Sequence, residues 1–327
     1  MQKINEQILV NRARALLADG TVTRVLGWKR GDFDWDVTPG VMTADTLGEF
    51  VWGDFSAPNL SKYLLAETKK DGKLLVFLKP CDTYSFNQLL TEHRFDREKV
   101  YAIGVPCDGM LDNKKLSAFD GISSVESDED TVTIHTLYDG DITVARGEML
   151  AERCRNCKSK KHVAYDELLG EDGEVIDSNR FDEVEKIEAM SADERFAFWQ
   201  NELSKCIRCN ACRDVCPACT CEKCVFDNPA SGIESKAPSD SFEEKMFHII
   251  RAFHVAGRCT DCGECSRVCP QGIPLHLLNR KIIKDMNGFW GEYQAGETVG
   301  SRAPLIDYTL DDMEAGERGG GNAYNCV

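Results

Sequence analysis

Two runs of four cysteines constrain this chain more than any other feature of its sequence. Each run has the spacing Cys-x2-Cys-x2-Cys-x3-Cys-Pro, and the runs occupy residues 206–217 and 259–270. Disulfide frameworks are typical of short secreted proteins, whereas this chain has 327 residues. Cysteines only two or three residues apart also suit a shared metal better than disulfides, which need particular Cα separations. The two runs therefore predict metal centres with thiolate ligands.

The spacing of the runs is typical of proteins that bind two [4Fe–4S] clusters. In that arrangement three neighbouring thiolates bind three corners of one cubane, and the fourth cysteine binds the other cluster. Structural zinc is the alternative, because pairs of cysteines also bind zinc, but zinc sites usually use two pairs rather than four-cysteine runs that end in proline. We therefore expect crossed ligand sets: Cys206, Cys209, Cys212 and Cys269 for the first cluster, and Cys259, Cys262, Cys265 and Cys216 for the second.

A further set of four cysteines lies in the N-terminal half: Cys81, Cys107, Cys154 and Cys157. Cys81 and Cys107 each follow an apolar run that we predict to be a buried strand, and ligands bind at the carboxyl ends of strands in open α/β sheets. Five Lys or Arg residues flank the pair Cys154-x2-Cys157, which suits an anionic cluster. We therefore expect a third [4Fe–4S] cluster. The alternative is a redox-active disulfide in the CxxC pair, beside two structural cysteines.

Four cysteines remain once three clusters are assigned: Cys219, Cys221, Cys224 and Cys326. The spacing Cys219-x-Cys221-x2-Cys224 fits three corners of a fourth cluster, and we expect these thiols to bind one. Cys326 is a weaker candidate for the fourth ligand, because ordering its glycine-rich tail costs about 1–2 kcal/mol per residue. The alternatives are a free terminal thiol at Cys326 and a fourth ligand from the N-terminal domain.

The charge and the missing motifs exclude several classes of protein. Acidic residues outnumber basic ones by 55 to 39, for a net charge of −16, which argues against a nucleic-acid binder. We expect a cytoplasmic protein, because no apolar run approaches the roughly 20 residues that span a bilayer and the first residues do not resemble a signal peptide. GxGxxG and GxxxxGK[ST] motifs are absent, so no nucleotide-binding fold is predicted. His248 and His254 are expected to be packing or surface residues rather than ligands.

The pattern of apolar residues predicts the secondary structure of the N-terminal half. Apolar runs at 74–78 and 100–105 predict buried strands, with a helix at 84–93 between them, and residues 5–17 predict another helix. Asp139-Gly140 between two alternating runs predicts a hairpin over 131–146.

The resulting fold class is α+β, with an α/β domain that carries its own cluster site before a mostly helical domain for two [4Fe–4S] clusters. Residues 242–256 predict the helix that leads into the second cysteine run, after an inserted loop at 227–241. The domain limits are an α/β domain at 1–165, an acidic linker at 166–195, the ferredoxin-like domain at 196–290 and a C-terminal tail at 291–327.

Five segments together resemble a family of anaerobic iron–sulfur subunits: KPCD, VPCDG, CRNC, CIRCNACRDVCPACTCEKC and FHIIRAFHVAGRCTDCGECSRVCPQGIPLHLL. The family includes the A subunit of anaerobic sulfite reductase and the β subunits of sulfhydrogenase and formate dehydrogenases; β subunits of coenzyme F420-reducing hydrogenases are looser relatives. The resemblance covers residues 74–286.

The resemblance implies an electron relay within a multi-subunit oxidoreductase, without a substrate site of its own, whose partners are a catalytic subunit and another electron carrier or flavoprotein. Two alternatives stay open: a catalytic subunit that binds a flavin or F420, for which no motif is present, and a thiol-based redox sensor.

Overall fold

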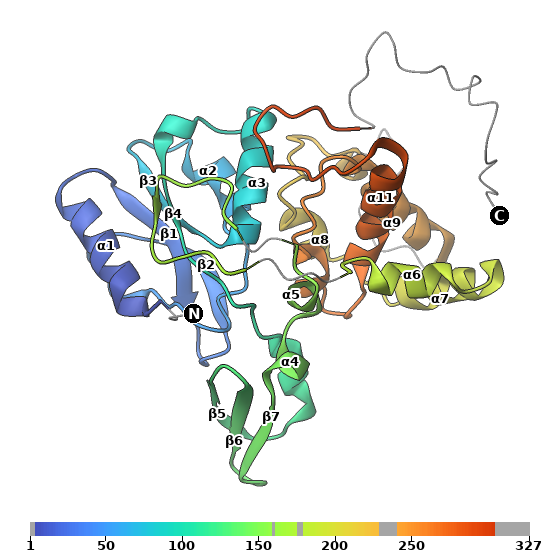
Figure 1. The fold of residues 1–327 in the computed structure, drawn as a ribbon, viewed down its shortest axis with the longest axis horizontal. Helices are drawn as coiled ribbons and strands as arrows, with labels where there is room; N and C mark the ends of the chain where they lie inside the picture. The colour runs from blue at the N-terminus through green and yellow to red at the C-terminus, as the bar shows by residue number, and fades with distance from the viewer. Residues whose placement is uncertain (1–3, 159–160, 175–178, 229–240, 305–327) are drawn as a thin grey trace.

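The N-terminal part of the chain folds around a five-stranded sheet (Figure 1). The computed structural model describes residues 4–158, 161–174, 179–228 and 241–304. The strands lie in the order β2 (Val37–Met42), β1 (Arg24–Arg30), β3 (Leu74–Leu78), β4 (Val100–Gly104) and β8 (Glu167–Leu168). β2 is antiparallel to β1, whereas the pairs β1–β3, β3–β4 and β4–β8 are parallel. The predicted α/β unit is thus present, with an antiparallel strand at one edge.

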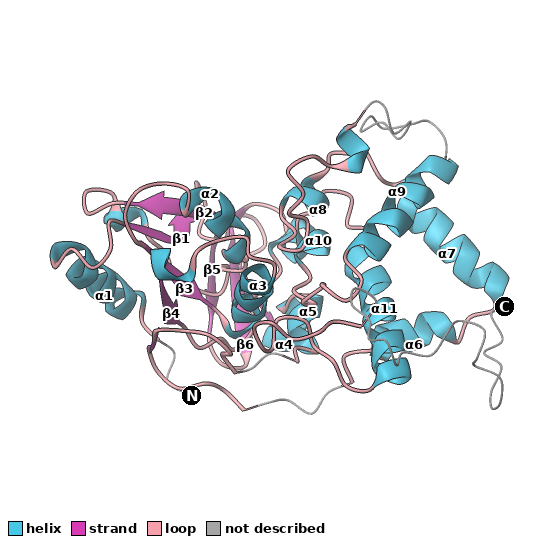
Figure 2. Cartoon of the chain, turned by 90° about the horizontal axis from the view of Figure 1, so that it is seen from above, coloured by secondary structure: helices cyan, strands magenta, loops and turns pink. Residues whose placement is uncertain are grey.

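Helices cover both faces of this sheet. In Figures 1 and 2, α1 (Glu6–Ala18) and α3 (Pro80–Thr91) lie on opposite sides of it. Every residue of β3 is buried, because a parallel strand between two helical layers is apolar on both faces. The helix predicted at 84–93 begins earlier, at Pro80, since proline suits the first turn of a helix and Asp82 accepts a hydrogen bond from the Lys79 backbone N–H. The single-turn helix α2 (Leu64–Glu67) precedes β3.

A second, antiparallel sheet projects from the α/β part (Figure 1). It consists of β5 (Ile122–Ser127), β6 (Thr131–Thr136) and β7 (Asp141–Ala145). The predicted hairpin is confirmed as β6 and β7, with Gly140 at a φ of 73° in the turn. The single-turn helices α4 (Arg146–Met149) and α5 (Glu152–Arg155) follow β7. They lead the chain back from this sheet toward Cys154 and Cys157.

Helices dominate the C-terminal part, which lies beyond α3 as seen from α1 (Figures 1 and 2). Four are longer than one turn: α6 (Asp182–Glu188), α7 (Ala192–Ser204), α9 (Ser241–His254) and α11 (Leu275–Trp290). Helix α9 packs against both α7 and α11. The single-turn helices α8 (Ala211–Asp214) and α10 (Glu264–Arg267) each lie inside one of the cysteine runs. None of the described helices combines the length and apolar character that a membrane span requires.

Residues 166–195, expected as an acidic linker, supply two regular elements. β8 extends the parallel sheet by pairing with β4, and α6 packs against α11. Most of the insertion expected at 227–241 falls outside the described residues, as does the tail from residue 305 onward. At the level of fold class, the mixed α/β character predicted from the sequence is confirmed.

Polar contacts attach the second cysteine run to the α/β part. The buried hydroxyl groups of Ser85 in α3 and Thr260 lie 2.9 Å apart. Lys114 Nζ donates to the backbone carbonyl of Cys269 at 2.7 Å, and the Arg258 guanidinium forms an ion pair with Glu92. Both ends of the run 259–270 are therefore fixed against the domain that contains the N-terminal cysteines.

Candidate iron–sulfur centres

The cysteines expected to bind the first cluster lie around one pocket. Its lining includes four thiols together with Phe247 and His248 of α9, and the thiols are those of Cys206, Cys209, Cys212 and Cys269. Cys206 follows the end of α7, and the loop after it turns through Arg208 and Asn210, whose φ angles are 53° and 62°. These left-handed residues curl the loop, and its three cysteines line the same pocket.

The second run repeats this local geometry. Asp261 and Gly263 have φ angles of 58° and 67°, in the same positions of the run as Arg208 and Asn210. Burial raises the pKa of Cys259, Cys262 and Cys265, and the neighbouring Cys216 raises each of them further. The fourth cysteine of the first run therefore lies beside the first three of the second run.

In the same way, Cys269, the fourth cysteine of the second run, lies beside Cys212 of the first run. Burial raises the pKa of Cys212, and the neighbouring Cys269 adds to that rise. Each run thus places its fourth cysteine with the other run, as the crossed ligand sets require. The crossed assignment itself stays a prediction about ligation.

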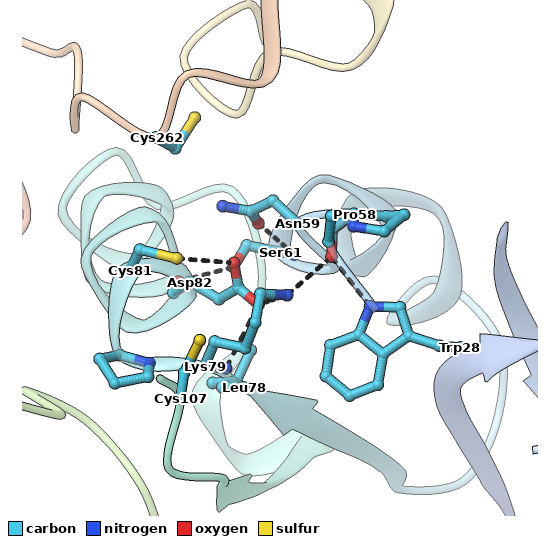
Figure 3. A network of polar contacts seen from close by, with 12 residues as sticks. Trp28, Pro58, Asn59, Ser61, Leu78, Lys79, Cys81, Asp82, Cys107 and Cys262 are labelled. Atoms are coloured by element: carbon cyan, nitrogen blue, oxygen red, sulfur yellow. Dashed lines mark hydrogen bonds and ion pairs between the residues drawn. The ribbon is translucent and has the colours of Figure 1, made fainter. Parts of the chain in front are cut away.

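The four N-terminal cysteines also line one pocket: Cys81, Cys107, Cys154 and Cys157. Cys81 lies in the first turn of α3, directly after β3, and Cys107 follows β4, so both stand at the carboxyl end of the parallel sheet. Cys154 belongs to α5. Cys262 of the second run lines the same pocket, and Figure 3 shows it across from Cys81 and Cys107. The third set therefore adjoins the second.

Backbone N–H groups are directed at several of these sulfur atoms. Gly109 N donates to Cys107 Sγ at 3.4 Å, and Met110 N donates to Cys154 Sγ at 3.5 Å. Arg208 N donates to Cys206 Sγ at 3.4 Å. Hydrogen bonds of this kind stabilise negative charge on sulfur and tune the potential of iron–sulfur clusters. The loops are thus arranged to receive thiolates rather than neutral thiols.

Burial opposes ionisation of Cys81 and Cys107 as free thiols. It raises the pKa of Cys107 to about 12, with Cys154 adding to the rise, and that of Cys81 well above the usual range. Metal ligands must be deprotonated, so a buried thiolate needs a cation beside it. Iron atoms supply that charge, which makes these groups of buried cysteines fit [4Fe–4S] clusters.

Two buried arginines lie where neighbouring cysteine sets meet. Arg251 of α9, 3% exposed, donates to the Cys212 carbonyl at 2.7 Å. Burial alone would lower its pKa, but Cys216, Cys212 and Cys265 raise it. Arg251 therefore faces thiols of both the first and the second set.

Arg153 of α5 occupies the corresponding place between the second and third sets. Its guanidinium donates to the carbonyl groups of Cys262 at 2.7 Å and Ala57 at 2.8 Å, and it pairs with the buried carboxylate of Glu264. Cys154 and Cys81 are among the groups that raise its pKa against the effect of burial. Fixed positive charge thus lies at both junctions.

A buried ion pair supports the start of α3 beside the third set (Figure 3). Lys79 Nζ lies 2.8 Å from Asp82 Oδ2 and donates to the Pro58 carbonyl at 2.9 Å. It also lies 4.4 Å from the ring centroid of Trp28, a cation–π contact. Both charged side chains are almost fully buried, so the position of Cys81 between them in sequence is rigidly defined.

Cys219, Cys221 and Cys224 line neither of the two pockets described above. The Cys219 thiol donates to Cys216, which lowers the pKa of Cys216. Cys221 is exposed and Cys224 is half-buried. Cys326 lies outside the described residues. The fourth cluster expected on Cys219, Cys221 and Cys224 therefore stays a prediction.

No disulfide bond joins Cys154 to Cys157 in the described part of the chain. In the same part of the chain, no three His, Cys, Asp or Glu side chains converge closely enough to hold a single metal ion. A cubane is bound differently, since each of its four cysteines binds a separate iron atom.

Arg251 carries no motif, and its place between the first and second cysteine sets was not expected from the sequence. Arg153 was expected only as one of the basic residues that flank Cys154 and Cys157, and the structure also places it beside Cys262. His248 was expected to be a packing or surface residue, and it is buried beside the first cysteine set. The sequence does contain one signal for this arrangement. Phe247, His248 and Arg251 are spaced so that they share one side of a helix, and this helix leads into the second cysteine run.

Comparison with known proteins places the C-terminal cysteines in a recognised domain. Residues 202–273 match the family model of the 4Fe–4S dicluster domain. The chain is 24% identical to the β subunit of F420-dependent formate dehydrogenase from Methanocaldococcus jannaschii, over 84% of this chain and 88% of that protein. It is also 24% identical to the β subunit of F420-dependent formate dehydrogenase 1 from Methanococcus maripaludis, over 82% and 84% of the two chains.

Among solved structures, the F420-reducing [NiFe] hydrogenase complex from Methanosarcina barkeri contains a chain with 16% identity and a TM-score of 0.36, covering 46% of this chain and 59% of that one. This likeness is too weak to define the fold. The sequence similarities confirm the expected resemblance to formate dehydrogenase β subunits. The chain is thus similar to β subunits of F420-dependent formate dehydrogenases, and residues 202–273 match a 4Fe–4S dicluster domain.

Proposed function

We propose that this chain carries single electrons through three [4Fe–4S] clusters, between a catalytic oxidoreductase subunit and another redox carrier. The first cluster is bound by Cys206, Cys209, Cys212 and Cys269, the second by Cys259, Cys262, Cys265 and Cys216, and the third by Cys81, Cys107, Cys154 and Cys157. The clusters supply the one-electron chemistry. The protein positions the thiolates, excludes water and places positive charge between the sites.

The order of the three sets is the observation that carries this proposal. Cys262 of the second set lines the pocket of the third, and Arg251 faces thiols of both the first and the second. The second set is therefore the middle member of a row. A row of one-electron centres suits a relay, because an electron that enters at either end passes through the middle cluster to reach the other.

Anaerobic purification of the full chain tests the proposal. We expect about twelve iron and twelve sulfide per chain for three clusters, and about sixteen of each if Cys219, Cys221 and Cys224 hold a fourth. Reduction with dithionite should produce the EPR spectrum of several interacting reduced clusters. Zinc in place of iron, or iron in amounts that account for a single cluster, contradicts a relay of three centres.

A partner is also required. We expect the chain to co-purify under anaerobic conditions with a catalytic subunit, and its clusters to become reduced when that subunit receives its own substrate. Clusters that remain oxidised in the intact complex, although dithionite reduces them, would show that the chain does not lie on the electron path.

A second function is favoured by the relatives, both of which are named as β subunits of F420-dependent enzymes. In that case the chain also exchanges electrons with a flavin or with F420 itself. To distinguish the two functions, the isolated chain is precipitated so that non-covalent cofactors are released, and the absorption spectrum of the supernatant is recorded. Free flavin in the supernatant supports the second function. Reduction of F420 by the chain in the presence of an electron donor supports it independently.

A further inference from the structure

His248 of α9 lies buried against the first cysteine set without the polar contacts that a buried imidazole needs. Its side chain is 2% exposed and lines the pocket formed by Cys206, Cys209, Cys212 and Cys269. Neither Nδ1 nor Nε2 has a hydrogen-bond partner among the described residues. A buried polar group left without a partner is destabilising, so this side chain is placed for a partner other than the protein groups around it.

Packing alone does not account for a histidine at this position. The ring meets Phe247 edge to face, with centroids 5.0 Å apart, a contact that phenylalanine or leucine would make without the polar cost. In either protonation state the imidazole carries at least one N–H donor.

The pocket identifies the missing partner by its chemistry. Four cysteine sulfur atoms share the pocket with the imidazole, and a [4Fe–4S] cluster bound there would add sulfide to thiolate as an acceptor. Each of these sulfur atoms carries negative charge, and charge-assisted hydrogen bonds are roughly twice as strong as neutral ones. An imidazole N–H is a suitable donor for such an acceptor.

We propose that His248 donates a hydrogen bond from its ring N–H to a sulfur atom of the first cluster, and that this bond raises the reduction potential of that cluster alone. The inference rests on the proposed function, because it requires a [4Fe–4S] cluster on Cys206, Cys209, Cys212 and Cys269. The direction follows from charge. Reduction adds one negative charge to the cluster, so a hydrogen bond to sulfur stabilises the reduced state more than the oxidised state.

The test is an EPR-monitored redox titration of the full chain and of His248→Phe, both purified anaerobically. We expect the first cluster of His248→Phe to become harder to reduce by about tenfold in its equilibrium constant, or about 59 mV for one electron. The other clusters should keep their potentials. His248→Gln keeps a side-chain N–H donor and should recover part of the difference.

His254 supplies the matched control, because it lies on the same helix and is exposed. His254→Phe should leave every potential unchanged. Equal potentials in the wild type and His248→Phe, at equal iron content, would overturn the inference, as would an equal shift of all clusters. A wild-type chain without iron would instead refute the proposed function, so the two failures are distinguishable.

A measurement on the unmutated chain covers the outcome in which His248→Phe loses its cluster. When histidine is labelled with ¹⁵N, pulsed EPR of the reduced wild type should detect a ¹⁵N coupling to one cluster, and His254→Phe should retain it. Absence of a histidine coupling from a chain that contains reduced clusters would contradict the hydrogen bond.

Discussion

A guanidinium between the first and second cysteine sets would act through its charge on both of the proposed clusters. Arg251 faces Cys212 of the first set and Cys216 and Cys265 of the second. In a buried site this charge is screened far less than at the surface. Since reduced clusters are more negative than oxidised ones, the arginine favours electrons on either side of it. Its effect therefore differs from that of His248, which we assign to the first cluster only.

Replacement of Arg251 by glutamine should lower the reduction potentials of both ferredoxin-type clusters and leave the third unchanged. The physical reason is the loss of one positive charge that both clusters share. Arg251→Lys, which keeps the charge, should retain most of both potentials. The measurement is an EPR-monitored titration, with Arg14→Gln on the exposed side of α1 as the control. A shift confined to one cluster would contradict a shared role.

Cys216 tests the crossed ligand sets at the same scale. In Cys216→Ser, we expect the cluster of Cys259, Cys262 and Cys265 to be lost or converted, because its fourth thiolate is removed. The cluster on Cys206, Cys209 and Cys212 should be perturbed less, although these residues share a run with Cys216. Mössbauer and EPR spectra of the reduced variant distinguish the clusters. Damage restricted to the first cluster would show that the ligands do not cross.

At the residue scale, the sequence predicted which cysteines of a run lie together, but not which other side chains lie beside them. Local spacing brings three cysteines of a run together whatever the rest of the chain does, so the grouping of Cys206, Cys209 and Cys212 could be anticipated. Arg251 and His248 reach the same pocket region from a helix that follows the first run by many residues. Only the packing of α9 between α7 and α11 determines which of its side chains face the cysteines.

At the scale of elements, the start of α3 depends on a charge pair with almost no access to water. Lys79→Met leaves the Asp82 carboxylate buried without its cation, and breaking a buried pair in this way costs about 3–5 kcal/mol. We expect a large fall in the urea midpoint of the full chain. Removing both charges, in Lys79→Met with Asp82→Leu, should recover part of the loss because no unpaired charge remains.

The surface pair of Lys70 with Glu67 is the control for this prediction, since Lys70 is 59% exposed. Exposed pairs contribute about 0–1 kcal/mol, so Lys70→Met should unfold close to the wild type. Equal effects of the two lysine substitutions would mean that the buried pair contributes no more than a surface one.

Helix α6 is attached to α11 by a carboxylate whose protonation can be controlled. Glu188 forms ion pairs with Lys281 at 2.8 Å and with Lys284. Burial alone would raise the pKa of Glu188, but the two lysines lower it. The attachment is therefore complete above the usual glutamate pKa near 4.3 and weakens as the pH falls below that value. Because these groups are partly exposed, its contribution stays below about 1 kcal/mol.

Glu188→Gln should accordingly increase amide hydrogen exchange in α6 a few-fold at pH 7. Exchange by the wild type, after correction for its intrinsic pH dependence, should stay protected down to about pH 5 and lose protection only at lower pH. Glu183→Gln, on the same helix but paired with Lys186 within it, is the control. Identical exchange in the two variants would contradict an attachment through Glu188.

The elements themselves were predictable where the pattern was local. The runs that became β3 and β4 are continuously apolar because both faces are covered, and the turn at Asp139-Gly140 defined the β6–β7 hairpin. β8 could not be anticipated, because two residues in an acidic segment carry no periodicity and pair only where β4 offers a free edge. The sequences of β1 and β2 likewise contain no clear strand pattern, because their pairing depends on contacts with the rest of the sheet.

At the scale of the whole molecule, the α/β part and the helical part meet at the second cysteine run. Cys107→Ser, which changes the set farthest from the first run, should lower the iron content by about four per chain. The EPR signals of the other two clusters should persist, because all their proposed ligands lie in the helical part. Unchanged iron in Cys107→Ser would remove the third cluster from the relay.

The sequence predicted an α/β part and a helical part, but not that the second cysteine run of the helical part would lie beside the cysteines of the α/β part. The α/β part contributes Cys81 and Cys107 from the ends of neighbouring parallel strands, which follows from the rule that ligands bind at that edge. The approach of Cys262 to the same pocket depends on contacts such as that between Ser85 and Thr260, which join residues far apart in the chain. Long-range pairs of this kind leave no mark on local composition.

The proposed exchange of fourth cysteines between the two runs would also constrain how the protein matures. During synthesis, the first run emerges with three thiolates of one site and a single thiolate of the other. The second site is complete only when residue 265 has been made, and the first only when residue 269 has been made. A cluster delivered earlier would have one iron without its proper protein ligand. Loading of the helical part is therefore expected to follow translation, and insertion of either cluster ties the two runs together and prepares the site of the other.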